Sequence, residues 1–158
     1  MSNKGSLCGI LFLVALGISP FPIHAIQNLT IDTNVVTIST PTVSDFDTGY
    51  VEQLAANTLT VESDINWKLT LKGTTASWSC TGAGCWGVKP RADVLWRPSG
   101  GGAYTSLSAT EATLATGGTT SPPGTVDVVV DYRIKVAWES DAEGTYDYDF
   151  ITYLLSPL

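Results

Sequence analysis

Two neighbouring cysteines are the residues whose type and spacing point most directly to chemistry. Cys80 and Cys85 stand in the stretch Ser-Cys-Thr-Gly-Ala-Gly-Cys-Trp. An isolated even pair is typical of a local disulfide if the chain is exported. A zinc site is the alternative, but two thiols need two further ligands, and only carboxylates are at hand to supply them. The pair therefore predicts a disulfide that pins the shape of a short loop.

Whether the secreted chain contains a histidine depends on where its N-terminal segment is cleaved. Lys4, the apolar run 7–18 and the small residue Ala25 form the three parts of a secretory signal peptide. The run is about a dozen residues, shorter than the roughly 20 that a spanning helix needs. Removal of residues 1–25 also removes His24, the only histidine. Serine–histidine catalysis and histidine-ligated metals are thereby excluded from the secreted chain, for which we expect no enzymatic activity.

A second motif, Asp47-Thr48-Gly49, matches the tripeptide of aspartic proteases. Such an enzyme needs two aspartates that share a proton, and the apolar strand that should precede the motif is absent. We favour a polar turn in which Gly49 adopts a positive φ.

Carboxylates at alternate positions precede Gly144 and resemble the first half of a calcium loop. They are Glu139, Asp141 and Glu143, and oxygen ligands on a tight turn are what calcium requires. Phe150 stands where such a loop places its bidentate glutamate. An acidic hairpin tip kept soluble by its charges is the alternative. No other cofactor is expected.

Exposed aromatic faces stack on sugars, and three tryptophans around the cysteine pair are candidates for such a platform: Trp78, Trp86 and Trp96. Burial in the core is the alternative for each of them. Asn28-Leu29-Thr30 also fits an N-glycosylation sequon.

Charge and length narrow the class of protein. The whole chain has 8 basic and 15 acidic residues and a net charge of −7. Loss of Lys4 takes that charge to −8, because 7 basic residues then remain against the same 15 acidic ones. Nucleic-acid binding needs clustered lysine and arginine and is not expected. Residues 26–158 have the length of one domain, and no later segment is apolar enough to span a membrane.

Period-2 alternation along the chain predicts an all-β fold. The clearest strand is Val126–Trp138, and a hairpin of 58–61 with 67–71 is expected. A last strand covers 145–155. Near the start of residues 26–158, the apolar residues Leu29 and Ile31 occupy odd positions. The polar stretch Asp32-Thr33-Asn34 interrupts this alternation, and the apolar residues then continue at the even positions Val36 and Ile38. We expect an immunoglobulin-like antiparallel β-sandwich of roughly seven to nine strands, with a small barrel as the competitor.

The stretches 35–51, 57–61 and 67–71, together with the ending 144–157, resemble prokaryotic secreted surface domains of the pilin and spore-coat-U type. The resemblance implies a non-enzymatic subunit that polymerises by lending an N-terminal strand to a neighbour. The apolar positions of such a strand would be Leu29, Ile31, Val36 and Ile38. The same segment is alternatively the edge strand of its own domain. A secreted monomer that adheres to surfaces or binds glycans is the competing function.

Overall fold

The computed structural model describes residues 25–33, 35–81, 89–119, 124–139, 141, 145–148 and 151–158. The strands in these ranges are β1 (Gln27–Ile31), β2 (Tyr50–Ser63), β3 (Trp67–Gly73), β4 (Ser79–Thr81), β5 (Val94–Pro98), β6 (Thr105–Ser106), β7 (Ala112–Gly117), β8 (Thr125–Lys135), β9 (Thr145–Asp147) and β10 (Ile151–Pro157). A short helix α1 (Val43–Thr48) precedes β2, and a 3₁₀ turn η1 (Arg91–Asp93) precedes β5.

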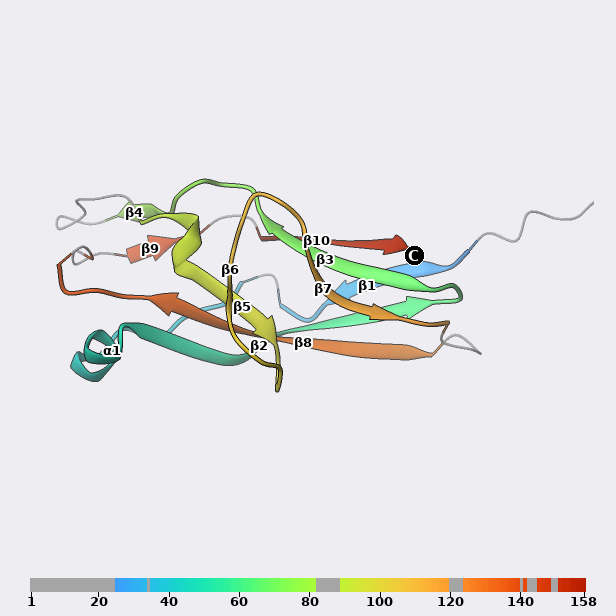
Figure 1. Cartoon of the computed structure of the whole chain (residues 1–158), viewed down its shortest axis with the longest axis horizontal. Helices are drawn as coiled ribbons and strands as arrows, with labels where there is room; N and C mark the ends of the chain where they lie inside the picture. Colours follow the sequence, from blue (N-terminus) through green and yellow to red (C-terminus); the bar gives the residue numbers. More distant parts are fainter. Residues whose placement is uncertain are drawn as a thin grey trace, which may run out of the picture.

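The strands form two facing antiparallel sheets and a small third one (Figure 1). The larger sheet has the order β1-β2-β8-β5-β6, and the facing sheet has the order β10-β3-β7. Strands β4 and β9 pair with each other beyond the ends of β3 and β10. The predicted all-β sandwich is confirmed.

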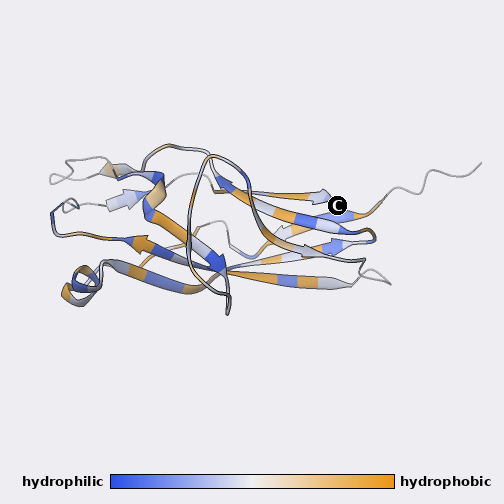
Figure 2. Cartoon of the chain, viewed as in Figure 1, coloured by the Kyte–Doolittle hydropathy of each residue, from blue (hydrophilic) through white to orange (hydrophobic). Residues whose placement is uncertain are grey.

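Alternating side chains build the core between the two sheets, and Figure 2 shows this alternation along β3 and β8. One side chain in two points inward on each strand, as the pleat requires. From the larger sheet the core receives Leu59, Val61, Val94, Trp96, Val128, Val130, Tyr132 and Ile134, and from the facing sheet Trp67, Leu69, Leu71 and Leu114. These residues are 8 % exposed or less.

The predicted hairpin between residues 58–61 and 67–71 is wrong. β2 pairs with β1 and β8, whereas β3 pairs with β10 and β7. The chain therefore crosses from one sheet to the other at Ser63, whose hydroxyl donates to the Ile65 carbonyl at 2.8 Å. β2 and β3 turn their apolar faces to the same core from opposite sheets, which makes an arch. Two strands paired in a hairpin would show the same alternation, so alternation alone does not distinguish the two arrangements.

The long strand predicted at Val126–Trp138 is shorter in the structure. β8 ends at Lys135, and Trp138 is 60 % exposed instead of facing the core. Its ring stacks on Phe46 of α1, with centroids 4.3 Å apart. At the other end, Val126 is 40 % exposed. The predicted last strand is likewise divided into β9 and β10.

The turn predicted at Asp47-Thr48-Gly49 is confirmed as the end of α1. Gly49 has φ 82° and occupies the C-cap, where its N–H donates to the Asp45 carbonyl at 2.8 Å. At the start of the helix, the Thr42 and Asp45 side chains each bond the other's backbone N–H, which is a capping box. These hydrogen bonds hold the pKa of Asp45 below its usual value, with the Thr42 backbone N–H as the main cause.

Candidate functional site

The N-terminal segment, residues 26–41, forms one edge of the molecule. Its first part is β1, which pairs with β2 at the edge of the larger sheet and places Leu29 opposite Val61. Leu29 and Ile31 are half-buried against the core. Within this single chain the segment lies at the edge of its own domain, and whether a neighbour receives it stays a prediction.

Asp32 ends β1 and ties it to β2. Its carboxylate accepts the Thr58 N–H at 2.9 Å, and its own N–H donates to the Thr58 carbonyl at 3.1 Å. The backbone bond from Thr58 is the main cause that lowers the pKa of Asp32. The chain then changes direction, so that the interruption predicted at this point is confirmed.

Residues 35–41 follow without joining a sheet. Val36 and Ile38 are half-buried against the core, whereas Val35, Thr37 and Ser39 are exposed. In the part of the chain that the structure describes, no strand pairs with this stretch. Its alternation is that of a strand, but its backbone lacks the ladder of hydrogen bonds that a strand normally has.

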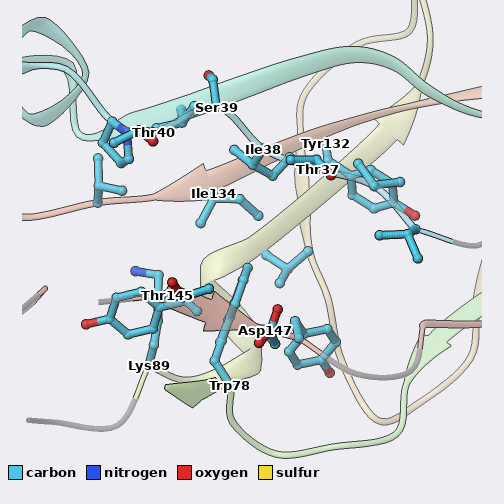
Figure 3. Close-up of a pocket in the computed structure, with 18 of the residues that line it drawn as sticks. Thr37, Ile38, Ser39, Thr40, Trp78, Lys89, Tyr132, Ile134, Thr145 and Asp147 are labelled. Carbon is cyan, nitrogen blue, oxygen red and sulfur yellow. The ribbon is translucent and has the colours of Figure 1, made fainter. Parts of the chain in front are cut away.

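A cavity of about 1160 Å³ lies under this stretch. Figure 3 shows Thr37–Thr40 on one side of it and Trp78, Thr145 and Asp147 on the other. Its apolar wall consists of core-facing side chains from both sides of the sandwich, namely Val51, Val94, Ile134, Val136, Trp78, Tyr148 and Ile151. The cavity opens to solvent, and the core-facing side chains of its wall, among them Val51 and Val94, remain buried.

Polar side chains at the end of the cavity connect the segment to both sheets. The Tyr132 and Tyr153 hydroxyls are hydrogen-bonded, and Tyr153 donates to Asn57 Oδ1 at 3.2 Å. Asn57 in turn donates from Nδ2 to the Thr33 carbonyl at 3.0 Å. Burial is the main cause that raises the pKa of Tyr153 to about 12 and the pKa of Tyr132 well above its usual value. Both phenols therefore act as neutral hydrogen-bonding groups.

A bulge in β2 shapes the wall that carries Asn57. The register between β2 and β8 shifts between Gln53 and Asn57, and Ala55 has φ 47°. The Ala55 N–H donates to Asp131 Oδ1 at 2.9 Å, and the other oxygen of Asp131 accepts from Arg97 Nε at 3.0 Å. Asp131 lies on the face of β8 opposite the core-facing Val130 and Tyr132, yet this bulge and Arg97 cover it to 1 % exposure.

Beside this bulge, the outer face of the larger sheet carries an aromatic–arginine cluster. The Arg133 guanidinium lies 3.7 Å from the Tyr50 ring centroid and 4.1 Å from that of Tyr104. Arg133 also donates to Glu52 at 3.0 Å, and Tyr104 donates to the same carboxylate. The bond from Tyr104 is the main cause that lowers the pKa of Glu52. Every member has a partner within the cluster, so its role is to hold β2, β8 and the 99–104 loop together.

Of the tryptophans predicted as a sugar platform, the structure describes two. Trp96 is 5 % exposed and belongs to the core, which corrects its assignment as a ligand residue. Trp78 is half-buried and packs on Tyr148 with centroids 5.4 Å apart. Trp86 lies outside the described residues. Alternation along β5 could have placed Trp96 inside, since Val94 and Trp96 share one face.

The remaining predicted sites have different outcomes. Cys80 lies in β4, but Cys85 is outside the described residues, so their disulfide stays a prediction. Asn28 is exposed on β1, where its glycosylation also stays a prediction.

The calcium prediction loses one of its ligands. The Asp141 carboxylate accepts from Lys89 Nζ at 2.9 and 3.0 Å and from the Ala137 N–H at 2.8 Å, which occupies its oxygens. Glu139 is exposed, and Glu143 is outside the described residues. The described ranges contain no group of three or more histidine, cysteine or acidic side chains that could hold a metal ion.

Lys89 is the residue at this site that sequence reasoning missed. Its side chain is 5 % exposed and is held by Asp93, Asp141 and the Lys135 carbonyl. The i,i+4 spacing of Lys89 and Asp93 was the available signal, but it usually marks an exposed helix pair.

Comparisons with protein-family models and with curated proteins find no match to this chain. Among the helical residues that the structure describes, none belongs to a helix long and apolar enough to cross a membrane.

Proposed function

We propose that this protein is a non-enzymatic extracellular structural subunit that assembles into a pilus-like filament by donating its N-terminal strand to the next copy. The donated segment is residues 26–41. Each copy gives this segment to one neighbour and accepts the same segment from another. The observation that carries the proposal is an edge segment that lies over an open cavity and, in the described ranges, pairs with a single strand.

The segment is suited to exchange because its contacts are separable from those of the rest of the domain. Removing it would leave the other core residues on β2, β3, β5, β7 and β8. Its second half packs on the core through the half-buried Val36 and Ile38, but no described strand pairs with it, so fewer hydrogen bonds hold it than hold β1. An exchanged copy restores the same contacts, so the cost of exchange is mainly that of opening the segment.

The connection to the domain allows such an exchange to continue from copy to copy. Residues 39–42 are exposed and lie between the segment and the capped helix α1. A donor that leaves at this point enters the edge of another molecule, and the contact is head-to-tail rather than reciprocal. Head-to-tail contacts that do not close into a ring extend into filaments.

Signal cleavage fits the same proposal. Ile26 N lies 2.8 Å from Asp64 Oδ1. Cleavage after Ala25 would make that nitrogen a charged α-ammonium, and the hydrogen bond would become an ion pair that anchors the donated strand at the end of its acceptor. Export would thus prepare the segment for assembly.

The competing function, a secreted monomer with a sugar-binding aromatic platform, has less support. Of its three tryptophans, Trp96 is in the core and Trp78 packs against Tyr148.

Substitutions that invert the donor face test the proposal. The double variant Val36→Asp/Ile38→Asp places carboxylates on the core-facing positions, and Thr37→Asp/Ser39→Asp adds the same charge on the exposed positions. Sedimentation and electron microscopy of the purified secreted protein should show filaments for the wild type and the control but not for the inverted variant. Circular dichroism checks that each variant is folded.

Two results would contradict the proposal. One is a wild-type protein that stays monomeric at every accessible concentration. The other is an inverted variant that is folded and still forms filaments, since assembly would then use another surface.

A further inference from the structure

A buried asparagine lies among the apolar core residues of β2. Asn57, Leu59 and Val61 share the face of this strand that points to the core, and Asn57 is 4 % exposed. A polar side chain at such a position costs stability unless its hydrogen bonds are made. Here both ends of the amide are paired, since Nδ2 donates to the Thr33 carbonyl at 3.0 Å and Oδ1 accepts from the Tyr153 hydroxyl at 3.2 Å. Asn57 thus connects the core to the N-terminal segment.

The partners of Asn57 fix the direction of its amide. Tyr153 gives its only hydroxyl proton to Asn57 Oδ1, so Tyr132 is the donor in the hydrogen bond between the two phenols. Each group in the series Tyr132, Tyr153, Asn57 and Thr33 therefore bonds to the next, from β8 through β10 and β2 to the segment. With Oδ1 held by Tyr153, the Nδ2 atom points at the segment.

The ladder between β1 and β2 does not select one register by itself. Its backbone hydrogen bonds do not depend on the identity of the side chains. A slip by two residues returns Leu29 and Ile31 to the core side, because the pleat has a period of two. Such a slip moves β1 by about 7 Å along β2. A feature other than apolar alternation must therefore select the register in which Asn28 faces Glu62.

The Thr33 carbonyl supplies this selection. The chain bends at Asp32, so the carbonyl lies just after a bend and not within a regular strand. A slip by two residues carries the bend about 7 Å away from Asn57, far beyond the length of a hydrogen bond. The amide N–H would then be buried without a partner, which costs more than the bond itself contributes. The bond between Asp32 and the Thr58 N–H is exposed, so water replaces it in a slipped strand.

We propose that Asn57 sets the register of the N-terminal strand on β2 by binding the Thr33 carbonyl, with Tyr153 as the positioning residue that directs its amide. A buried asparagine selects the register of coiled coils by the same principle. In a monomer this register lock acts on the chain's own strand. For a strand received from a neighbour the inference rests on the proposed function, and Asn57 of the acceptor then binds Thr33 of the donor.

Pairs of added cysteines report the register. Asn28→Cys/Glu62→Cys joins residues that face each other in the structure. Asn28→Cys/Thr60→Cys and Thr30→Cys/Glu62→Cys are the slipped pairs, whose members face each other only after a slip of two residues in one direction or the other. In the observed register the slipped pairs are diagonal neighbours with Cα atoms about 7–8 Å apart, too far for a disulfide. Labelling of free thiols followed by intact mass measures the fraction cross-linked within one chain.

Only the facing pair should cross-link while Asn57 is present. Asn57→Leu should raise the cross-linked fraction of a slipped pair by about tenfold, because no buried amide then opposes the slip. Tyr132→Phe is the matched control. It removes a buried hydrogen bond from the same series but leaves Asn57 paired with Thr33, so the slipped pairs should stay reduced.

A second variant repeats the test in case Asn57→Leu does not fold, which circular dichroism checks. Asn57→Thr has a shorter side chain that does not extend to Thr33, and it keeps a hydroxyl that accepts from Tyr153. It should free the slipped pairs as well. The register lock is overturned if the slipped pairs cross-link no more in the folded variants than in the wild-type background, or if they already cross-link with Asn57 in place.

The same cysteines divided between two mixed preparations separate the register lock from strand donation. Cross-links within one chain that respond to Asn57→Leu, with none between chains, would refute donation and support the lock. Cross-links between chains that keep the observed register in Asn57→Leu would support donation and refute the lock.

Discussion

Replacing the buried carboxylate of Asp131 should destabilise the domain by several kcal/mol. Asp131→Ala leaves the Ala55 N–H without its acceptor and Arg97 without its partner. Loss of one partner from a fully buried pair costs about 3–5 kcal/mol. Arg97 keeps 23 % exposure, so water compensates part of this loss, and we expect about 3 kcal/mol. Asp131→Asn retains an oxygen for Ala55 and should cost about 1–2 kcal/mol.

The same residue predicts how stability depends on pH. Burial raises the pKa of Asp131, but the hydrogen bonds from Ala55 and Arg97 outweigh it, so the folded-state pKa lies below the usual 3.8. Because the folded-state pKa is lowered, the carboxylate stabilises the fold fully at pH values above its unfolded-state pKa. This contribution is lost as the pH falls from about 4 towards and below the folded-state pKa. The difference in the free energy of unfolding between the wild type and Asp131→Asn should therefore decrease as the pH falls.

Urea unfolding followed by tryptophan fluorescence measures both effects. Asp127→Asn is the matched control, because Asp127 is an exposed acid on the same strand and bonds only Thr60 among the described residues. That control should change stability by less than about 0.5 kcal/mol. If Asp131→Ala costs no more than the control, or if the gap does not change with pH, the role assigned to Asp131 is refuted.

Three further measurements test other parts of the structure. Gly117→Ala should cost about 1–3 kcal/mol in urea unfolding, because its Cβ would lie 2.4 Å from Trp67 Cζ2; an unchanged midpoint would contradict this contact. Gly49→Ala should cost about 1 kcal/mol by the same assay, since φ there is 82°, and wild-type stability would show that the cap tolerates a side chain. A chelator should leave the melting temperature unchanged, because Lys89 occupies the carboxylate of Asp141; a clear drop would restore the calcium site.

The inward-facing residues could be predicted from alternation, because the pleat forces successive side chains to opposite faces whatever the strand pairs with. Leu59, Val61, Leu69 and Val130 follow this rule and are buried. Gly49 could be predicted for a local reason as well, since a left-handed cap depends on one residue and its neighbours.

Features that depend on contacts between distant segments could not be predicted in this way. At Ser63 the chain passes from β2 in one sheet to β3 in the other, which is an arch. In a hairpin β2 and β3 would pair with each other, whereas here β2 pairs with β8 and β3 pairs with β7. The burial of Asp131 depends on a bulge in another strand and on Arg97 in a third. Residues 35–41 line the cavity without entering a sheet in the described ranges, although their alternation is that of a strand.

Disulfide cross-linking between two variants, each with one cysteine added to the native Cys80 and Cys85, tests strand donation most directly. Asn28 and Glu62 face each other across β1 and β2. One preparation carries Asn28→Cys, the other carries Glu62→Cys, and the two are mixed, allowed to assemble and oxidised. A third variant, Thr113→Cys on the exposed side of β7, replaces Glu62→Cys in the control mixture.

Strand donation predicts a covalent dimer of Asn28→Cys with Glu62→Cys, because β1 of one copy then lies beside β2 of another. The control mixture should give none. In a chain that keeps its own β1, the two cysteines reside in different molecules and do not meet. Absence of the dimer from assembled filaments, with efficient internal cross-linking of the double variant Asn28→Cys/Glu62→Cys, would contradict the account.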